Sequence, residues 1–218
     1  MTGREAQEAF DRVLVVDFGA QYARLIARRV REARVFSEIV PRQVTATEVA
    51  ARRPVGLILS GGPASVYAED AYTLDPAILG LGLPILGICY GHQVLAQMLG
   101  GEVARTGAAE FGKTELGITA AGTLLQGLAA GQAVWMSHRD AVVRAPAGFQ
   151  VTATTAACPV AAMEDRAGGR FGVQFHPEVA HTPRGDEVLK AFLFDACGAR
   201  PTWTRASIIE QAIAGVRR

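Results

Sequence analysis

The continuous apolar run Val13–Val16 near the start of the chain predicts a strand that is buried on both faces. Further strands are predicted at about Val35–Val40, Val55–Ser60 and Pro84–Ile88. A strand with apolar residues at every position has no solvent face, which is typical of a parallel sheet covered by helices on both sides.

Between these runs, apolar residues recur at helical spacing. After Val13–Val16, one stripe of a predicted helix carries Tyr22, Ile26, Val30 and Ala33. Arg24, Arg28 and Arg31 form another stripe, which we interpret as a solvated face rather than a docking surface. Further helices are predicted near Ala46–Ala51, Leu74–Gly80, Gly185–Ala196 and Thr204–Val216.

The middle of the chain follows a different pattern. From about Glu102 to Phe175 the sequence is rich in strand formers separated by Gly and Pro turns. The repeated β–α units before it imply a mostly parallel central sheet flanked by helices. The sequence therefore predicts an α/β fold in which additional antiparallel strands flank a parallel core.

Composition and charge agree with one cytoplasmic domain. A chain of 218 residues that is 50% apolar can bury a sizeable core. The net charge of +1 gives no reason to expect nucleic acid or a membrane as a partner. The three cysteines are far apart, so we expect neither disulfides nor a metal site. No apolar run is long enough for a membrane helix, and the N-terminus lacks a signal core.

The strongest candidate for chemistry is Cys89, in the sequence Gly87-Ile88-Cys89-Tyr90-Gly91. It stands between the predicted strand Pro84–Ile88 and an amphipathic run that begins at Gln93. G-x-C-x-G is the cysteine counterpart of the nucleophile elbow, a strained turn that exposes the nucleophile at the sheet edge. The N-terminus of the following helix favours the thiolate over the thiol.

A second motif supplies partners for a nucleophilic cysteine. Another β-rich run ends in Phe175-His176-Pro177-Glu178. A cysteine nucleophile needs a base to accept its proton and a third group to orient that base. Because His176 and Glu178 are two residues apart, their side chains would share one side of an extended segment. Cys89, His176 and Glu178 are therefore the predicted catalytic triad.

Together these motifs resemble the class I glutamine amidotransferases, which hydrolyse glutamine and deliver ammonia to a second active site. Further stretches resemble the amidotransferase domain of the GMP synthase branch, and the resemblance extends from about Val13 to the C-terminus. These stretches are Asp17–Tyr22, Leu59–Pro63, Glu110–Gly112, Trp135–His138 and His176–Thr182. The resemblance implies a flavodoxin-like fold, a γ-glutamyl thioester on Cys89, and no cofactor bound by this chain.

The resemblance also implies the residues around the nucleophile. Ser60-Gly61-Gly62-Pro63 follows a predicted strand, so backbone N–H groups of Gly61 or Gly62 and of Tyr90 are expected to form the oxyanion hole. Gln93 and the backbone around Ser137 and His138 resemble the glutamine-holding residues of the family. A purely structural histidine is an equally good interpretation of His138.

One position departs from the family pattern. Where the family has Ser-His-Gly-Asp, this chain has Arg139 between His138 and Asp140. If that glycine adopts a positive φ, arginine at this position is strained. The substitution leaves open whether the ammonia acceptor is XMP or another compound.

A phosphate-loop pattern is present but lacks its context. Gly107–Thr114 fits G-x-x-x-x-G-K-[ST], which binds nucleotides only where a helix begins at the lysine. Leu116 and Ile118 alternate as in a strand, so we predict no nucleotide site here. Ser60–Ser65 faintly resembles a pyrophosphate loop, but Ala64 stands where that loop has aspartate.

The predicted domain organisation is an N-terminal extension over residues 1–12, an amidotransferase domain over 13–200 and a connector helix over 201–218. The connector is expected to lead to a missing ATP pyrophosphatase domain or subunit that activates XMP with ATP and Mg²⁺. Expected partners are L-glutamine and that domain, with a possible homo-oligomer formed through it. We favour an excised domain over a natural separate subunit.

Two alternatives come from other functional classes. The chain could be a non-catalytic regulatory subunit of the same fold, but an intact Cys89, His176 and Glu178 argue against that interpretation. It could instead be a peptidase or another cysteine hydrolase on a related fold, which the His-Pro-Glu motif and Trp135–His138 disfavour.

Overall fold

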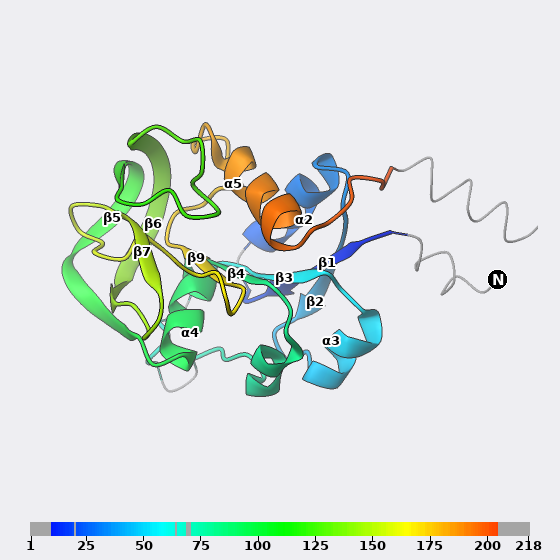
Figure 1. The fold of residues 1–218 in the computed structure, drawn as a ribbon. Helices are drawn as coiled ribbons and strands as arrows, with labels where there is room; N and C mark the ends of the chain where they lie inside the picture. The colour runs from blue at the N-terminus through cyan, green and yellow to red at the C-terminus, as the bar shows by residue number, and fades with distance from the viewer. Residues whose placement is uncertain (1–9, 20, 64, 69–70, 205–218) are drawn as a thin grey trace, which may run out of the picture.

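The computed structural model describes residues 10–19, 21–63, 65–68 and 71–204. Within them the strands form one nine-stranded sheet in the order β2-β1-β3-β4-β9-β8-β7-β5-β6 (Figure 1). Five neighbouring strands are parallel: β2 (Phe36–Pro41), β1 (Arg12–Asp17), β3 (Gly56–Leu59), β4 (Ile85–Ile88) and β9 (Arg170–Val173). This parallel half confirms the α/β prediction.

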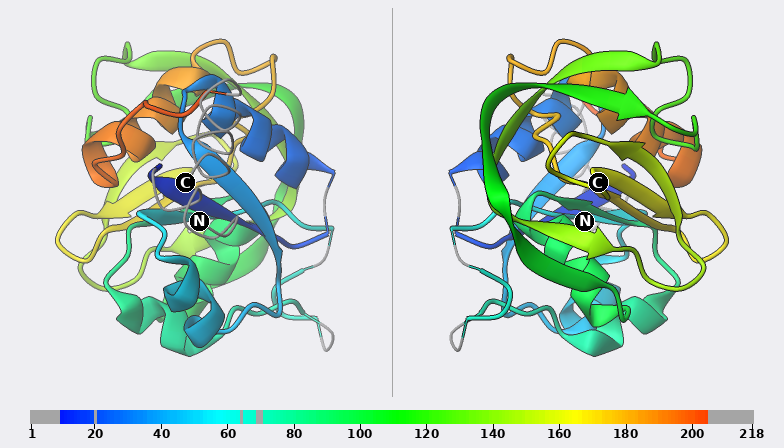
Figure 2. Two further views of the ribbon diagram at one scale, coloured as in Figure 1. Left: turned by 90° about the vertical axis from the view of Figure 1, so that its right-hand side faces the viewer. Right: turned by 90° about the vertical axis from the view of Figure 1, so that its left-hand side faces the viewer.

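The other half of the sheet is antiparallel, as the strand-rich middle of the chain predicts. Here β8 (Ala162–Asp165), β7 (Gln150–Thr154), β5 (Glu102–Ile118) and β6 (Gly131–Arg144) continue outward from β9. The two long strands β5 and β6 curve across that end of the molecule (Figure 2). Because β9 is both parallel to β4 and antiparallel to β8, it joins the two halves.

Helices cover both faces of the parallel half. Above the sheet in Figure 1 lie α2 (Tyr22–Glu32) and α5 (Gly185–Ala191), which continues as a π-helical turn over Phe192–Ala196. Below it lie α3 (Ala46–Arg52), α4 (Tyr90–Met98) and a 3₁₀ helix over Pro76–Leu81. Strands and helices alternate along this part of the chain, so the connections cross from one strand to the next over the faces of the sheet.

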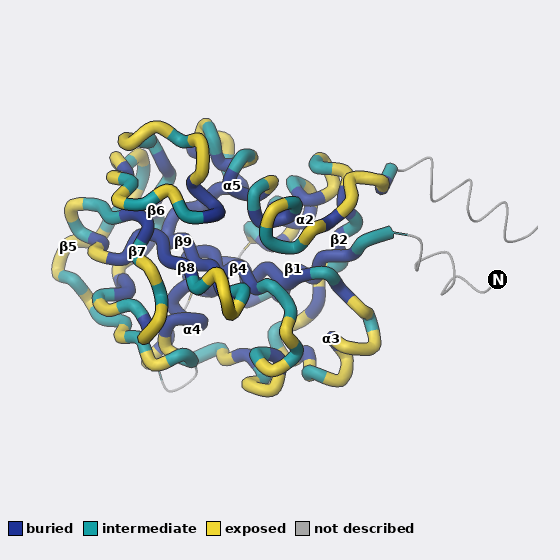
Figure 3. The backbone as a smooth tube through the Cα atoms, in the orientation of Figure 1, coloured by how far each residue is buried: buried dark blue, intermediate teal, exposed yellow. Residues whose placement is uncertain are grey.

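The alternation of side chains along β1 divides the core into two. Val13 and Val15 pack under α2 and α5, whereas Leu14 and Val16 pack on the opposite face. All four are fully buried, as are β3 and β4, whereas the edge strand β2 has exposed and half-buried positions (Figure 3). Burial on both faces is the reason that Val13–Val16 has no polar position.

Several element boundaries differ from those predicted. The helix expected over Leu74–Gly80 is a 3₁₀ helix. Asp75 caps its N-terminus by accepting a hydrogen bond from the Ala77 N–H, and Gly82 ends it in a left-handed conformation. In α2 the buried residues are Ala23, Ile26, Ala27 and Val30. The helix predicted over Thr204–Val216 lies outside the described residues except for Thr204.

Glycine is required on both sides of Cys89 by close backbone packing. A Cβ on Gly87 would lie 2.5 Å from the carbonyl oxygen of Gly91, and a Cβ on Gly91 would lie 2.6 Å from the Cβ of Leu59. These separations are far below van der Waals contact, so β3, β4 and α4 can approach one another only because both positions lack a side chain.

We expect Gly91→Ala to lower the free energy of unfolding by about 3 kcal/mol, because the added methyl group forces β3 and α4 apart. Gly80→Ala is the matched control: it has open space around its Cβ position, and we expect a change within about 0.5 kcal/mol. Urea unfolding of both variants measures the difference. Equal stability of the two variants would contradict this account of the elbow.

Candidate active site

Cys89 occupies the turn between β4 and α4 in a conformation that is rare for a residue with a side chain. Its φ is 53° and its ψ is −106°. The turn is held by a hydrogen bond from the Cys89 N–H to the carbonyl of Val173 at 2.9 Å. A strained backbone at the end of a strand is the geometry of a nucleophile elbow, and it places the sulfur at the edge of the sheet.

His176 and Glu178 follow β9, which lies directly beside β4, so both motifs meet at the carboxyl edge of the sheet. The Nδ1 atom of His176 lies 2.8 Å from Oε1 of Glu178. Because an ionised carboxylate only accepts hydrogen bonds, Nδ1 carries a proton and Nε2 is left for Cys89. The expected extended segment is not observed: the chain leaves β9 after Val173, and Glu178 lies in a turn.

The environment of His176 favours its charged form. Burial lowers the pKa of this histidine, but hydrogen bonds and charge interactions with Cys89 and Glu178 outweigh burial and raise it to about 11. At neutral pH the imidazole is therefore protonated beside the sulfur. An imidazolium in contact with a cysteine stabilises the thiolate, which is the nucleophilic form.

Several residues that received no predicted role hold the turn with His176 and Glu178 in place. The Thr182 hydroxyl donates to the His176 carbonyl at 2.6 Å and accepts the Trp135 N–H at 3.0 Å. The His176 N–H donates to the Trp135 carbonyl at 3.0 Å. Arg29 donates through Nε to the Glu178 carbonyl at 3.0 Å, and the Tyr22 ring packs against His176 with centroids 4.8 Å apart. Tyr22, Trp135 and Thr182 belong to stretches that resemble the family, but only the fold reveals these contacts.

A pocket of about 410 Å³ opens beside the sulfur. It gathers Cys89, Gly62, Tyr90, Gln93, Ser137 and His138, which are six of the nine predicted site residues, together with Pro63, Ser65, Arg105, Phe111, Arg139 and Asp140. His176, Glu178 and Gly61 are buried and do not line the pocket. Its lining carries charges of both signs, from Arg105, Arg139 and Asp140.

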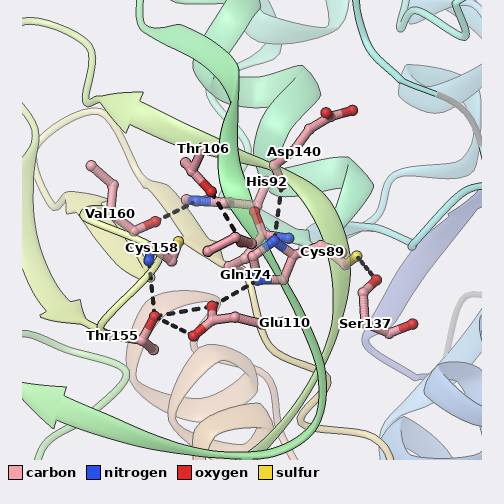
Figure 4. A network of polar contacts seen from close by, with 12 residues as sticks. Cys89, His92, Thr106, Glu110, Ser137, Asp140, Thr155, Cys158, Val160 and Gln174 are labelled. Atoms are coloured by element: carbon pink, nitrogen blue, oxygen red, sulfur yellow. Dashed lines mark hydrogen bonds and ion pairs between the residues drawn. The ribbon is translucent and has the colours of Figure 1, made fainter.

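Hydrogen bonds fix the inner wall of this pocket (Figure 4). The Gln93 side chain donates to the Asp140 carbonyl at 2.6 Å and to Oε1 of Gln174 at 3.0 Å. The Cys89 sulfur lies 3.8 Å from the Ser137 carbonyl oxygen. Both ring nitrogens of His138 have partners, the Asp140 carbonyl and the Glu110 carboxylate, each at 3.0 Å. Both nitrogens of the His138 ring are thus occupied by protein partners.

The Asp140 carboxylate, to which the sequence assigns no role, ties a loop to the rim of the pocket. It accepts hydrogen bonds from the hydroxyls of Ser65 and Tyr67, the latter at 2.5 Å. Its side chain is 8% exposed, although it lies 3.9 Å from the exposed Arg105. Asp140 therefore connects β6 with the loop that follows β3.

Two doubts raised by the sequence are resolved by the backbone. Gly107–Thr114 lies within β5 and is paired with β6 from Glu110 onward, so no helix begins at Lys113. Arg139 is not among the described non-glycine residues with positive φ, which are Arg34, Arg53 and Cys89. Arginine is therefore unstrained at the position where the family has glycine.

The class-I glutamine amidotransferase family model matches residues 14–196, which include all the residues of the site. The chain belongs to this family. Among solved structures, a candidate GMP synthase subunit from Thermoplasma acidophilum is 31% identical with a TM-score of 0.76, covering 87% of this chain and 94% of that one. A glutamine amidotransferase from Thermotoga maritima shares the fold of this amidotransferase, with a TM-score of 0.64 at 20% identity, covering 94% and 93% of the two chains.

Curated relatives place the amidotransferase near one branch of the family. The glutamine-hydrolysing GMP synthase of Parafrankia sp. (strain EAN1pec) is 57% identical over 212 residues, and that of Thermobifida fusca (strain YX) is 55% identical over 211. Each alignment covers 97% of this chain and 40% of the relative. The chain thus spans about 40% of the length of these relatives.

Neither a metal site nor a membrane span is found in the part of the chain that the structure describes. No group of three His, Cys, Asp or Glu side chains there is placed to bind a metal ion. None of the described helices is both long and apolar enough to cross a bilayer.

Proposed function

We propose that this amidotransferase hydrolyses L-glutamine to glutamate and ammonia through a covalent intermediate on Cys89. The observation that carries the proposal is the juxtaposition of Cys89, on a strained elbow, with a His176–Glu178 pair whose side chains are joined at 2.8 Å. The pocket beside the sulfur has room for one amino acid.

The proposed reaction has two halves. The Cys89 thiolate attacks the side-chain amide carbon, the C–N bond breaks, and His176 gives its proton to the departing nitrogen, which leaves as ammonia. In the second half a water molecule loses a proton to His176 and attacks the γ-glutamyl thioester, which releases glutamate and restores the thiolate. Glu178 holds His176 in the required tautomer and stabilises its positive charge.

The pocket lining supplies groups for the substrate. Backbone N–H groups of Gly61 or Gly62 and of Tyr90 would hold the oxyanion that forms on the amide oxygen. Gln93 and the backbone of Ser137 and His138 would hold the glutamine. Because free glutamine carries both an ammonium and a carboxylate, a lining with Asp140, Arg105 and Arg139 suits it.

We infer that the ammonia serves GMP synthesis. The support is the 55–57% identity to glutamine-hydrolysing GMP synthases over nearly the whole chain. In this proposal residues 201–218 connect the domain to an ATP pyrophosphatase domain or subunit, which binds ATP and Mg²⁺ and aminates XMP in the cytoplasm. Trp203 supports an ordered start of that connector, since it is buried and its N–H donates to the Arg34 carbonyl at 2.9 Å.

Covalent labelling tests the glutaminase proposal. We expect the glutamine analogue 6-diazo-5-oxo-L-norleucine to label Cys89, and we expect excess L-glutamine to prevent it. Cys158 and Cys197 should stay unlabelled, because burial raises the pKa of both thiols. Labelling that glutamine does not reduce would favour a different cysteine hydrolase, and no labelling would favour a non-catalytic subunit.

The acceptor is tested by adding the partner. Glutamate release should rise when an ATP pyrophosphatase partner, ATP and XMP are all present, because a loaded partner completes the productive complex. A rate that does not respond to any of these additions would retain the glutaminase and point to another ammonia acceptor.

A further inference from the structure

The pairing of β5 with β6 is interrupted close to the nucleophile. The register shifts between Arg105 and Glu110, so the intervening residues of β5 do not fix the alignment of the two strands. Regular pairing resumes where Glu110 lies directly opposite His138. The contacts that hold Glu110 opposite His138 therefore set the register of the part of β6 that passes Cys89.

The side chains of this pair are buried and joined to each other. Nε2 of His138 lies 3.0 Å from Oε2 of Glu110, with side-chain exposures of 2% and 10%. The Thr155 hydroxyl, from the segment after β7, lies 2.8 Å from Oε1 of Glu110 and receives the Cys158 N–H at 3.0 Å (Figure 4). Glu110 thus joins β5, β6 and the segment that follows β7.

The partners of His138 determine where its protons are. The Asp140 carbonyl can only accept, so Nδ1 of His138 must carry a proton. Nε2 of His138 faces Oε2 of Glu110, so a proton must lie between these two atoms for them to be hydrogen-bonded. This bond ties a side chain of β6 to a side chain of β5.

The strand that this pair aligns touches both halves of the catalytic apparatus. One residue before His138, the Ser137 carbonyl lies 3.8 Å from the Cys89 sulfur. Three residues before it, the Trp135 carbonyl accepts the His176 N–H at 3.0 Å. A shift of β6 would therefore change the separation of the nucleophile and its base.

We propose that Glu110 is a positioning residue for the reaction, acting through its hydrogen bond with His138 to set β6 against Cys89 and His176. This inference rests on the proposed glutaminase function. Glu110 does not line the pocket, and it contacts neither Cys89 nor His176 in the described contacts. Glu110 affects the positions of Cys89 and His176 through β6.

Glu110→Gln keeps the size of the side chain and its bond to Thr155 but removes the charge. We expect kcat for glutamine hydrolysis to fall about tenfold to a hundredfold, because small misplacements of reacting groups have effects of that size. Glu115→Gln is the control: the same change on the same strand, at an exposed residue outside the pocket, should leave kcat unchanged.

A double-mutant comparison tests whether Glu110 acts through His138. His138→Gln, and the double variant with both Glu110→Gln and His138→Gln, should each lose about as much kcat as Glu110→Gln alone, since the effects of residues that act as one unit are not additive.

A spectroscopic measurement separates positioning from a general loss of structure, and it needs no activity. With ¹⁵N-labelled histidine the chain gives signals from only four residues, and His138→Gln assigns one of them. We expect the ring-nitrogen signals of His138 to move in Glu110→Gln, because the carboxylate partner of Nε2 is lost, and to keep their wild-type positions in Glu115→Gln. Alkylation of Cys89 by iodoacetamide should also become slower in Glu110→Gln than in Glu115→Gln.

Specific results would overturn the inference. Ring signals of His138 that do not move in Glu110→Gln would do so, as would equal kcat and alkylation rates in the two glutamine variants, or additive losses in the double variant. A wild-type chain without glutaminase activity would instead refute the proposed function. In that case the ring signals and the alkylation rates still decide whether Glu110 positions the cysteine.

Discussion

Cys89→Ala should lose at least about a thousandfold of the glutaminase activity, because no other group can form the thioester and removal of a covalent nucleophile has effects of this size. The fold should survive. The side chain is small, it is 6% exposed, and its contact with the Ser137 carbonyl is long, at 3.8 Å. Glutamate release measures the loss, and urea unfolding measures stability.

Cys197→Ala is the matched control for this substitution. Cys197 follows the π-helical turn, far along the chain from the elbow, and it does not line the pocket. It should retain near wild-type activity. If Cys89→Ala released glutamate about as fast as Cys197→Ala does, the nucleophile would have been assigned wrongly.

Glu178→Gln should lower glutaminase activity about a hundredfold or more, since loss of the orienting carboxylate of a triad has effects of that size or larger. The amide can still accept a hydrogen bond from Nδ1 of His176, so the shape of the site is retained. What disappears is the negative charge that faces a buried imidazolium. The kinetic measurement is glutamate release at saturating glutamine.

The same substitution should change how stability depends on pH. The pKa of His176 is raised on folding from an ordinary value of 6.5 to about 11, so its proton stabilises the fold. That stabilisation is fully present below about pH 6.5 and is lost as the pH rises through about 11. Glu178→Gln removes one cause of the raised pKa.

The variant should therefore be less stable than the wild type at about pH 6, and the difference should shrink at about pH 10. Urea unfolding at the two pH values measures it. A stability difference that is independent of pH would mean that Glu178 acts through packing rather than through the charge of His176.

Local patterns were sufficient to predict the parallel half of the fold and to single out the two motifs, around Cys89 and His176, that meet at the edge of the sheet. Val13–Val16 is apolar at every position because helices cover both faces of β1. Gly87 and Gly91 flank Cys89 because no side chain fits at either place. Such constraints act within a few residues, so the sequence displays them directly.

Contacts between distant segments could not be predicted in this way. Nothing in the local sequence relates Glu110 to His138 or to Thr155, because the pairing arises from the register of β5 and β6 and from the position of the segment after β7. The role of Asp140 is equally hidden, since its partners Ser65 and Tyr67 lie more than seventy residues earlier in the chain. Even the His176–Glu178 pair forms in a turn, although their spacing suggested an extended segment.

The most direct test of the central claim is to trap the acyl-enzyme. The chain would be mixed with L-glutamine, quenched in acid within a turnover, digested and examined by mass spectrometry. The expected result is one γ-glutamyl group on the peptide that contains Cys89, removable by hydroxylamine as a thioester would be, and absent from Cys89→Ala. Glutamate formation at the normal rate with no adduct on that peptide would contradict covalent catalysis by Cys89.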